Sequence, residues 1–165
     1  MKSGLLFDFN VNKENKTLNV TREFAADKDT VWEAWTEKEI LDQWWAPKPW
    51  KTDTKSMDFR EGGRWLYAMR GPEGEEHWSF SDFTSVSPKD NYQFSDGFCD
   101  SEGNMNKELP KSNWSISFKA SGNSTIVNVK ITYDSLKDLE GFIEMGFKEG
   151  FTMAMENLDE LFANR

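Results

Sequence analysis

Two side chains in this sequence have the chemistry of a catalytic base and a nucleophile. His77 is the only histidine, and we place it in a strand beside Trp78, where its imidazole could orient a carbonyl group or accept a proton. Cys99 is the only cysteine and becomes a nucleophile only where a base approaches it. We expect this histidine to be structural or to contact a ligand. The sequence therefore favours a protein without enzymatic activity.

Two groups of acidic residues are the candidates for metal binding or acid–base chemistry. Neither group has the fixed loop spacing of a calcium site, and we place both in solvated turns. A single histidine and a single cysteine exclude a zinc site with three or four such ligands from this chain. We therefore predict no metal and no cofactor. The two groups are Asp96, Asp100 and Glu102, and Glu73, Glu75 and Glu76.

Aromatic residues are abundant, with 8 Trp and 13 Phe, and many recur at the spacing of a strand. One interpretation is a core in which these rings bury one another; the other is a pocket that the rings surround. The pocket hypothesis assigns its lining to one face of a sheet and to the last helix. The predicted lining residues are Trp65, Tyr67, Met69, His77, Trp78, Phe94, Phe98, Trp114, Phe147, Gly150 and Phe151.

Small residues recur every four positions in the last segment, at Gly146, Gly150 and Ala154, which places them on one helical face. Each glycine inside a helix costs about 1 kcal/mol relative to alanine. Either the helix packs closely against the sheet there, or the missing side chains leave space for a guest molecule. Both alternatives remain open from the sequence.

The elements that position these residues can be read from hydrophobic periodicity. Residues 5–24 predict a hairpin, and residues 27–45 predict two short helices. Asp27 or Thr30 can cap the first helix, and capping boxes occur at Thr30 and at Thr36. Residues 51–133 alternate with a period of two, which indicates antiparallel strands. The connection from Cys99 to Asn113 is an exposed loop or, alternatively, a lid. One long helix should begin at Asp134 or Ser135 and run to about Phe162. This order predicts an α+β fold.

Four motifs can be compared with those of known families: Val31–Thr36 (VWEAWT), Leu41–Pro47 (LDQWWAP), Phe59–Trp65 (FREGGRW) and Gly146–Phe151 (GFKEGF). They resemble the activator of heat-shock protein ATPase homologue (AHSA-type) branch of the START-like (SRPBCC) superfamily. The resemblance covers about residues 17–163 and implies a helix-grip fold, a curved antiparallel sheet around a long C-terminal helix. It also implies a cavity, which the superfamily uses for lipids, hormones, polyketides and aromatic compounds. We expect one domain over residues 1–165, in which residues 1–16 add a strand and a turn.

Charge and hydropathy limit the possible partners. A net charge of -9 and a pI of about 4.7 argue against nucleic acid and against an anionic membrane surface, both of which attract clustered basic residues. No apolar run approaches the roughly 20 residues of a membrane-spanning helix, and residues 1–11 lack the pattern of a signal peptide. We therefore expect a cytoplasmic protein.

The function that the sequence favours is non-catalytic binding of a small hydrophobic or aromatic molecule in an internal cavity. One alternative is an enzyme of the hydrolase or cyclase type, in which His77 or a buried carboxylate assists the reaction. Another is a chaperone-associated interaction module, suggested by the family name and by the expected exposure of Trp44, Trp45 and Trp50. Tryptophans around a proline loop are also compatible with a homodimer interface.

Overall fold

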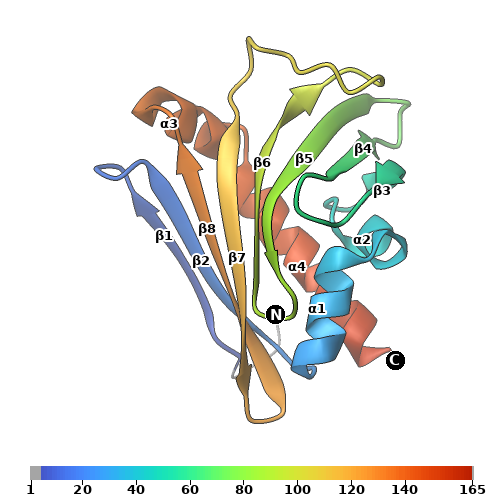
Figure 1. The fold of residues 1–165 in the computed structure, drawn as a ribbon, viewed down its shortest axis with the longest axis vertical. Helices are drawn as coiled ribbons and strands as arrows, with labels where there is room; N and C mark the ends of the chain where they lie inside the picture. Colours follow the sequence, from blue (N-terminus) through green and yellow to red (C-terminus); the bar gives the residue numbers. More distant parts are fainter. Residues whose placement is uncertain (1–4, 165) are drawn as a thin grey trace.

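A computed structural model describes residues 5–164 (Figure 1). The predicted N-terminal extension begins at residue 1, so its first four residues lie outside the described range. The elements are β1 (Phe7–Asn12), β2 (Thr17–Phe24), α1 (Lys28–Thr36), α2 (Lys38–Trp44), β3 (Lys51–Met57), β4 (Arg64–Arg70), β5 (Glu76–Ser87), β6 (Asn91–Cys99), β7 (Ser112–Ser121), β8 (Ser124–Tyr133), α3 (Leu136–Glu144) and α4 (Phe147–Ala163).

The strands form one antiparallel sheet in the order β1-β2-β8-β7-β6-β5-β4-β3 over the described residues. Pairing of β2 with β8 joins the N-terminal hairpin to the last strand, so the curved sheet is continuous from β1 to β3. Helix α4 crosses one face of this sheet, and α1 and α2 cover the same face beside it (Figure 1). The predicted α+β helix-grip fold is confirmed. None of the helices in residues 5–164 combines the length and the apolar character needed to span a membrane.

The first short helix begins at one of its two expected caps, whereas the second begins without its expected capping box. Asp27 caps α1, because its carboxylate accepts a hydrogen bond from the Thr30 amide at 2.8 Å. The second capping box is absent. The Thr36 hydroxyl donates to the Trp32 carbonyl at 2.8 Å, and Glu37 precedes α2 without a side-chain cap. The helices nevertheless abut as predicted, since only Glu37 separates them.

The predicted long C-terminal helix is wrong in one respect: it is broken at Met145 and Gly146. Ser135 caps α3 as expected, but α3 ends at Glu144, and Gly146 adopts φ +88° before α4 begins. This left-handed backbone conformation interrupts the helical hydrogen bonds, and glycine is the residue that adopts it without a steric cost. Gly146 therefore forms a bend between two helices, whereas Gly150 lies within α4.

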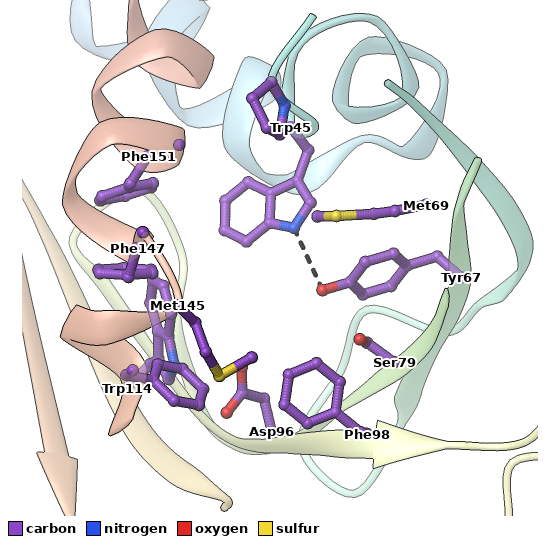
Figure 2. A pocket seen from close by; sticks show the side chains of 14 residues that line it. Trp45, Tyr67, Met69, Ser79, Asp96, Phe98, Trp114, Met145, Phe147 and Phe151 are labelled. Carbon is purple, nitrogen blue, oxygen red and sulfur yellow. Dashed lines mark hydrogen bonds between the residues drawn. The ribbon is translucent and has the colours of Figure 1, made fainter. Parts of the chain in front are cut away.

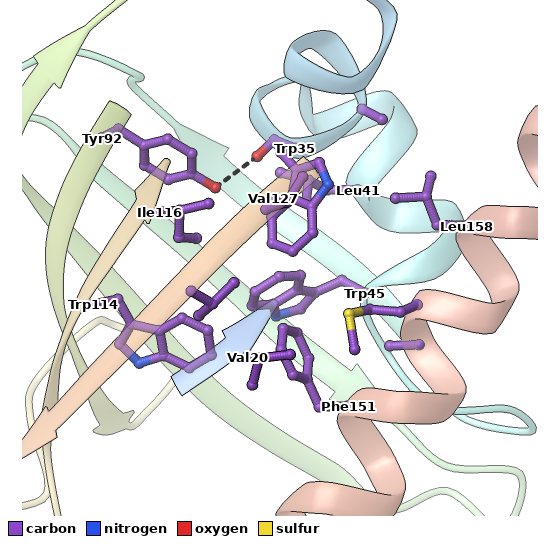
Figure 3. Packing of buried hydrophobic residues seen from close by; sticks show 14 of the residues in the cluster. Val20, Trp35, Leu41, Trp45, Tyr92, Trp114, Ile116, Val127, Phe151 and Leu158 are labelled. Carbon is purple, nitrogen blue, oxygen red and sulfur yellow. Dashed lines mark hydrogen bonds between the residues drawn. The ribbon is translucent and has the colours of Figure 1, made fainter. Parts of the chain in front are cut away.

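Aromatic and aliphatic side chains from α1, α2, the sheet and α4 form the core (Figure 3). The Trp35 ring lies 4.8 Å from that of Trp44 and 6.4 Å from that of Phe151, centroid to centroid. Trp44 and Trp45 are 1% and 9% exposed, so their expected exposure is wrong. The Trp44 indole donates to the Ala34 carbonyl at 2.9 Å, which satisfies its polar edge inside the core. These two rings are therefore not part of a partner-binding surface.

The connection between β6 and β7 covers the outer face of the sheet, away from α4. The Arg64 guanidinium donates to the Gly103 carbonyl at 2.8 Å, and the Leu66 side chain lies close beneath Gly103. Lys55 donates to the Ser101 carbonyl at 2.7 Å. Through Ser101 and Gly103, this connection shields apolar side chains on the outer face, and the lid alternative stays a prediction.

Candidate functional site

A cavity of about 230 Å³ lies between the inner face of the sheet and the bend that joins α3 to α4 (Figure 2). Met145 lines it and is also 64% exposed, which places this residue at the cavity mouth. The sheet provides the opposite wall through β4, β5, β6 and β7. The lining residues are Trp45, Pro47, Tyr67, Met69, Ser79, Asp96, Phe98, Trp114, Phe142, Met145, Gly146, Phe147, Gly150 and Phe151.

One wall consists of packed rings. Phe147 and Phe151, one helical turn apart on α4, stack with centroids 5.3 Å apart. The Trp114 ring meets both edge-on, at 6.0 Å from Phe147 and 5.8 Å from Phe151. These contacts are the geometry that aromatic quadrupoles favour, so the rings hold one another in place. The wall is therefore a preformed apolar surface.

Gly150 lines the space beside this wall and has no side chain to occupy it. A Cβ atom placed there would find its nearest neighbour, the Pro47 Cγ atom, at 3.7 Å, an ordinary van der Waals distance. Gly150 is consequently not required for a close approach of the α4 backbone to the sheet. Of the two explanations for its presence, open space is the one that fits this geometry.

Tyr67 of β4 brings a hydroxyl group into the cavity. Its ring stacks on that of Trp65 at 4.0 Å, and its oxygen accepts a hydrogen bond from the Trp45 indole at 3.2 Å (Figure 2). Trp65 is held in turn by its indole, which donates to the Thr54 hydroxyl at 3.0 Å. Burial raises the pKa of Tyr67, so this group stays a neutral phenol at physiological pH.

Asp96 of β6 is a carboxyl group at the sheet end of the cavity. It lies opposite Ser81 on β5 and Ser112 on β7, and the Ser112 hydroxyl donates to it at 2.5 Å. The Trp114 indole donates to the same Ser112 oxygen at 3.0 Å, which leaves the hydroxyl hydrogen free to point at Asp96. Burial raises the pKa of Asp96 to about 7, although hydrogen bonds from Ser112 and Trp114 oppose the rise.

The placement of Asp96 corrects the sequence interpretation, which put this residue in a solvated turn. Tyr92, Phe94, Asp96 and Phe98 occupy every second position of β6, and this period of two places all four on the inner face. That alternation is the signal that identifies it. The cavity residues on the connecting segments, such as Pro47 and Met145, had no such signal, because no periodic pattern predicts where a loop or a helix bend lies.

Most of the predicted lining residues do line the cavity, namely Tyr67, Met69, Phe98, Trp114, Phe147, Gly150 and Phe151. Trp65 and Phe94 lie one layer behind it. Trp65 stacks on Tyr67, and Phe94 stacks on Trp114 with centroids 5.4 Å apart. Both orient rings that reach the cavity.

His77 and Trp78 do not line the cavity. Trp78 is on the outer face of the sheet, where Arg70 and Lys55 lie over its ring at 5.8 and 5.9 Å. The spacing of apolar residues predicted that Trp78 faces inward, but the outer face of β5 is also apolar. The neighbouring Ser79 is the residue that points into the cavity. His77 is exposed at the end of β5 and stacks on Trp50 at 5.4 Å.

The proposed pairing of His77 with Cys99 also fails on geometry. Cys99 lies opposite Trp78 in the β5–β6 register, and His77 lies opposite Met69 in the β4–β5 register. Since Trp78 and His77 are neighbours along β5, the two pairs occupy opposite faces of the sheet. Burial raises the pKa of the Cys99 thiol, which further disfavours a thiolate. Within residues 5–164, no group of three or more His, Cys, Asp or Glu side chains is arranged to hold a metal ion.

Comparison with known proteins places this geometry in a family. Residues 25–163 match the family model described as Activator of Hsp90 ATPase homolog 1-like protein. A crystal structure of protein Ms6760 from Mycobacterium smegmatis is 30% identical, with a TM-score of 0.87 over 95% of this chain and 96% of that one. A solution structure of a protein from Arthrobacter aurescens is 28% identical, with a TM-score of 0.90 over 96% of this chain and 92% of that one.

A third similar structure is protein NE0264 from Nitrosomonas europaea, which is 26% identical with a TM-score of 0.78 over 91% of this chain and 96% of that one. A comparison with curated protein sequences gave no match. The family match covers most of the chain, and its fold agrees with the sheet and helices described above. The chain therefore belongs to the family of Activator of Hsp90 ATPase homolog 1-like proteins.

Proposed function

We propose that this protein binds a small apolar or aromatic molecule in the cavity between the sheet and the α3–α4 bend, without catalysing a reaction. The observation that supports the proposal is the combination of a preformed ring wall with the empty position at Gly150. An apolar cavity of 150 Å³ in another protein binds benzene, so about 230 Å³ accommodates a body of one or two rings.

The alternatives have weaker support. The enzyme alternative named His77 or a buried carboxylate. His77 is exposed, stacks on Trp50 and is not among the residues that line the cavity, so Asp96 is the lining residue left for that alternative. The interaction module depended on exposed tryptophans, and Trp44 and Trp45 are buried. The family name describes what a relative does with a heat-shock ATPase, and a shared fold does not transfer that activity.

Thermal denaturation with a panel of one- and two-ring apolar compounds tests the proposal. A compound at 100 times its Kd stabilises the folded state by about 2.7 kcal/mol. For a domain of this size, that gain corresponds to a rise in Tm of roughly 5–10 °C. We expect such a rise for at least one compound in the panel.

The matched variants are Gly150→Leu and Gly141→Leu. The first places a side chain in the cavity; the second places it on α3, where an added Cβ meets nothing within 4 Å. Gly150→Leu should abolish the rise in Tm, and Gly141→Leu should preserve it. If no compound raises Tm, or if Gly150→Leu responds as the wild type does, the proposed binding site is wrong.

A further inference from the structure

The charge balance of the cavity indicates what kind of guest it accepts. Of the fourteen lining residues, which all lie in the described part of the chain, Asp96 and Tyr67 are the ones with ionisable side chains, and none is basic. We propose that the guest carries a protonated amine, attached to its aromatic or apolar body, and that this ammonium group pairs with the Asp96 carboxylate. The inference rests on the binding function proposed above and deepens it.

The hydrogen bonds that reach Asp96 come from neutral donors. The Ser112 hydroxyl donates to its carboxylate, and the nearby Ser112 backbone amide and Trp114 indole also lower its pKa. Such donors stabilise the ionised form of the carboxyl group and fix its orientation, but they leave its negative charge uncompensated. A cation brought by the guest supplies that compensation.

A more deeply buried carboxyl group, on α4, shows the contrast. Asp159 on α4 forms a salt bridge with the Arg22 guanidinium of β2, and the Arg22 side chain is 1% exposed. The fold thus supplies its own cation to this carboxylate in the core. At Asp96 it supplies hydroxyl and indole donors and leaves the side facing the cavity open to a guest.

The surroundings of Asp96 also suit an ammonium group. Figure 2 shows its carboxyl group beside Trp114, with Phe98 and Met145 around it, while Trp45 and Phe151 lie at the opposite end of the cavity. Aromatic faces attract cations through their quadrupole, and the remaining rings provide apolar area for the body of the guest. An amine nitrogen at the Asp96 end and a ring near Gly150 would use both.

Other charged guests fit less well. An anion would meet the Asp96 carboxylate without a basic side chain to offset it. A divalent metal ion requires about six oxygen ligands, and the cavity adds only the Ser79 and Tyr67 hydroxyls to one carboxyl group. A neutral hydrogen-bond acceptor would bind the protonated form of Asp96, so it predicts the opposite dependence on pH.

That difference in pH dependence can be attributed to Asp96. Among the ionisable groups near it, the hydroxyls of Tyr67 on β4 and Tyr133 on β8 have a pKa that burial raises. Asp96 also borders a second hollow, whose charged residues are Arg64, Asp82, Lys111 and Asp134. The side chains that α3 and the bend present to the cavity are Phe142 and Met145, which do not titrate, and α4 likewise presents Phe147 and Phe151. Between pH 5 and 8, Asp96 is therefore the group that changes charge at this site.

The experiment compares three compounds of similar shape by isothermal titration calorimetry: 2-phenylethylamine, which is cationic; n-propylbenzene, which is neutral; and 3-phenylpropanoate, which is anionic. At pH 8 we expect the amine to bind about 10- to 100-fold more tightly than propylbenzene, the range of a charge-assisted hydrogen bond. The anion should bind most weakly. Below the pKa of Asp96, amine affinity should fall roughly tenfold per pH unit, and propylbenzene affinity should not.

The variant Asp96→Asn keeps the shape of the side chain and removes its charge. It should lower amine affinity at pH 8 by about 10- to 100-fold and leave propylbenzene affinity nearly unchanged. If propylbenzene binds and the amine binds no better, the amine inference is wrong and the binding function stands. If no compound binds, the proposed binding function fails as well. Amine affinity that is independent of pH in the wild type also overturns the inference.

Discussion

The replacement Gly150→Ala tests whether glycine at this position leaves space or allows close packing. The Gly150 amide already donates to the Gly146 carbonyl at 2.9 Å, so the residue is within the hydrogen-bonded helix. Alanine there reduces the conformational freedom of the unfolded chain and favours the helix by about 0.5–1 kcal/mol. Its Cβ would meet Pro47 Cγ at 3.7 Å, which imposes no clash. We therefore expect the variant to be more stable than the wild type.

Urea denaturation followed by tryptophan fluorescence measures this gain, and a thermal scan should show a rise in Tm of about 1–4 °C for a domain of this size. Gly141→Ala is the control, because it makes the same change in α3, where an added Cβ meets nothing within 4 Å. Both variants should gain stability, but Gly150→Ala alone should weaken binding of an apolar compound. A clear loss of stability in Gly150→Ala alone would show that α4 needs glycine for packing, and our account of the cavity would then be refuted.

Three further variants test other parts of the structure. Gly146→Ala should destabilise the protein by about 1–2 kcal/mol in urea denaturation, because the φ of +88° at this position strains any residue with a Cβ. A gain in stability, as expected for Gly150→Ala, would contradict the bend at Gly146. Asp96→Asn should be about 1–4 kcal/mol more stable than the wild type at pH 8 but not at pH 4. The folded protein holds the Asp96 proton up to a pKa of about 7, whereas the unfolded chain releases it near pH 4. The free energy of unfolding of the wild type therefore falls as pH rises between these values. If calorimetry showed the same dependence of unfolding free energy on pH for Asp96→Asn and the wild type, this prediction would be excluded. Asp159→Asn should cost about 3–5 kcal/mol by leaving Arg22 buried without its partner, and Arg22→Met combined with Asp159→Leu should recover much of that loss; equal denaturation midpoints for Asp159→Asn and the wild type would argue against a buried pair.

Local patterns in the sequence were sufficient for the elements and the family. Alternation in strands such as β7 and β8, the two abutting helices and the tryptophan-rich motif at residues 41–47 each depend on neighbours along the chain, so they can be read without the fold. The inward direction of Tyr67, Phe98 and Trp114 followed from the same period of two.

Tertiary structure decided which of two apolar faces turned inward and where the cavity lay. On β5 both faces carry rings or small side chains, and only the coverage of Trp78 by Arg70 and Lys55 distinguishes the outer face. Gly146 could continue a helix or bend it, and this depends on how α3 and α4 pack on the sheet. The charge state of Asp96 depends on burial by residues distant in sequence, which local patterns do not record, because burial is a property of the whole fold.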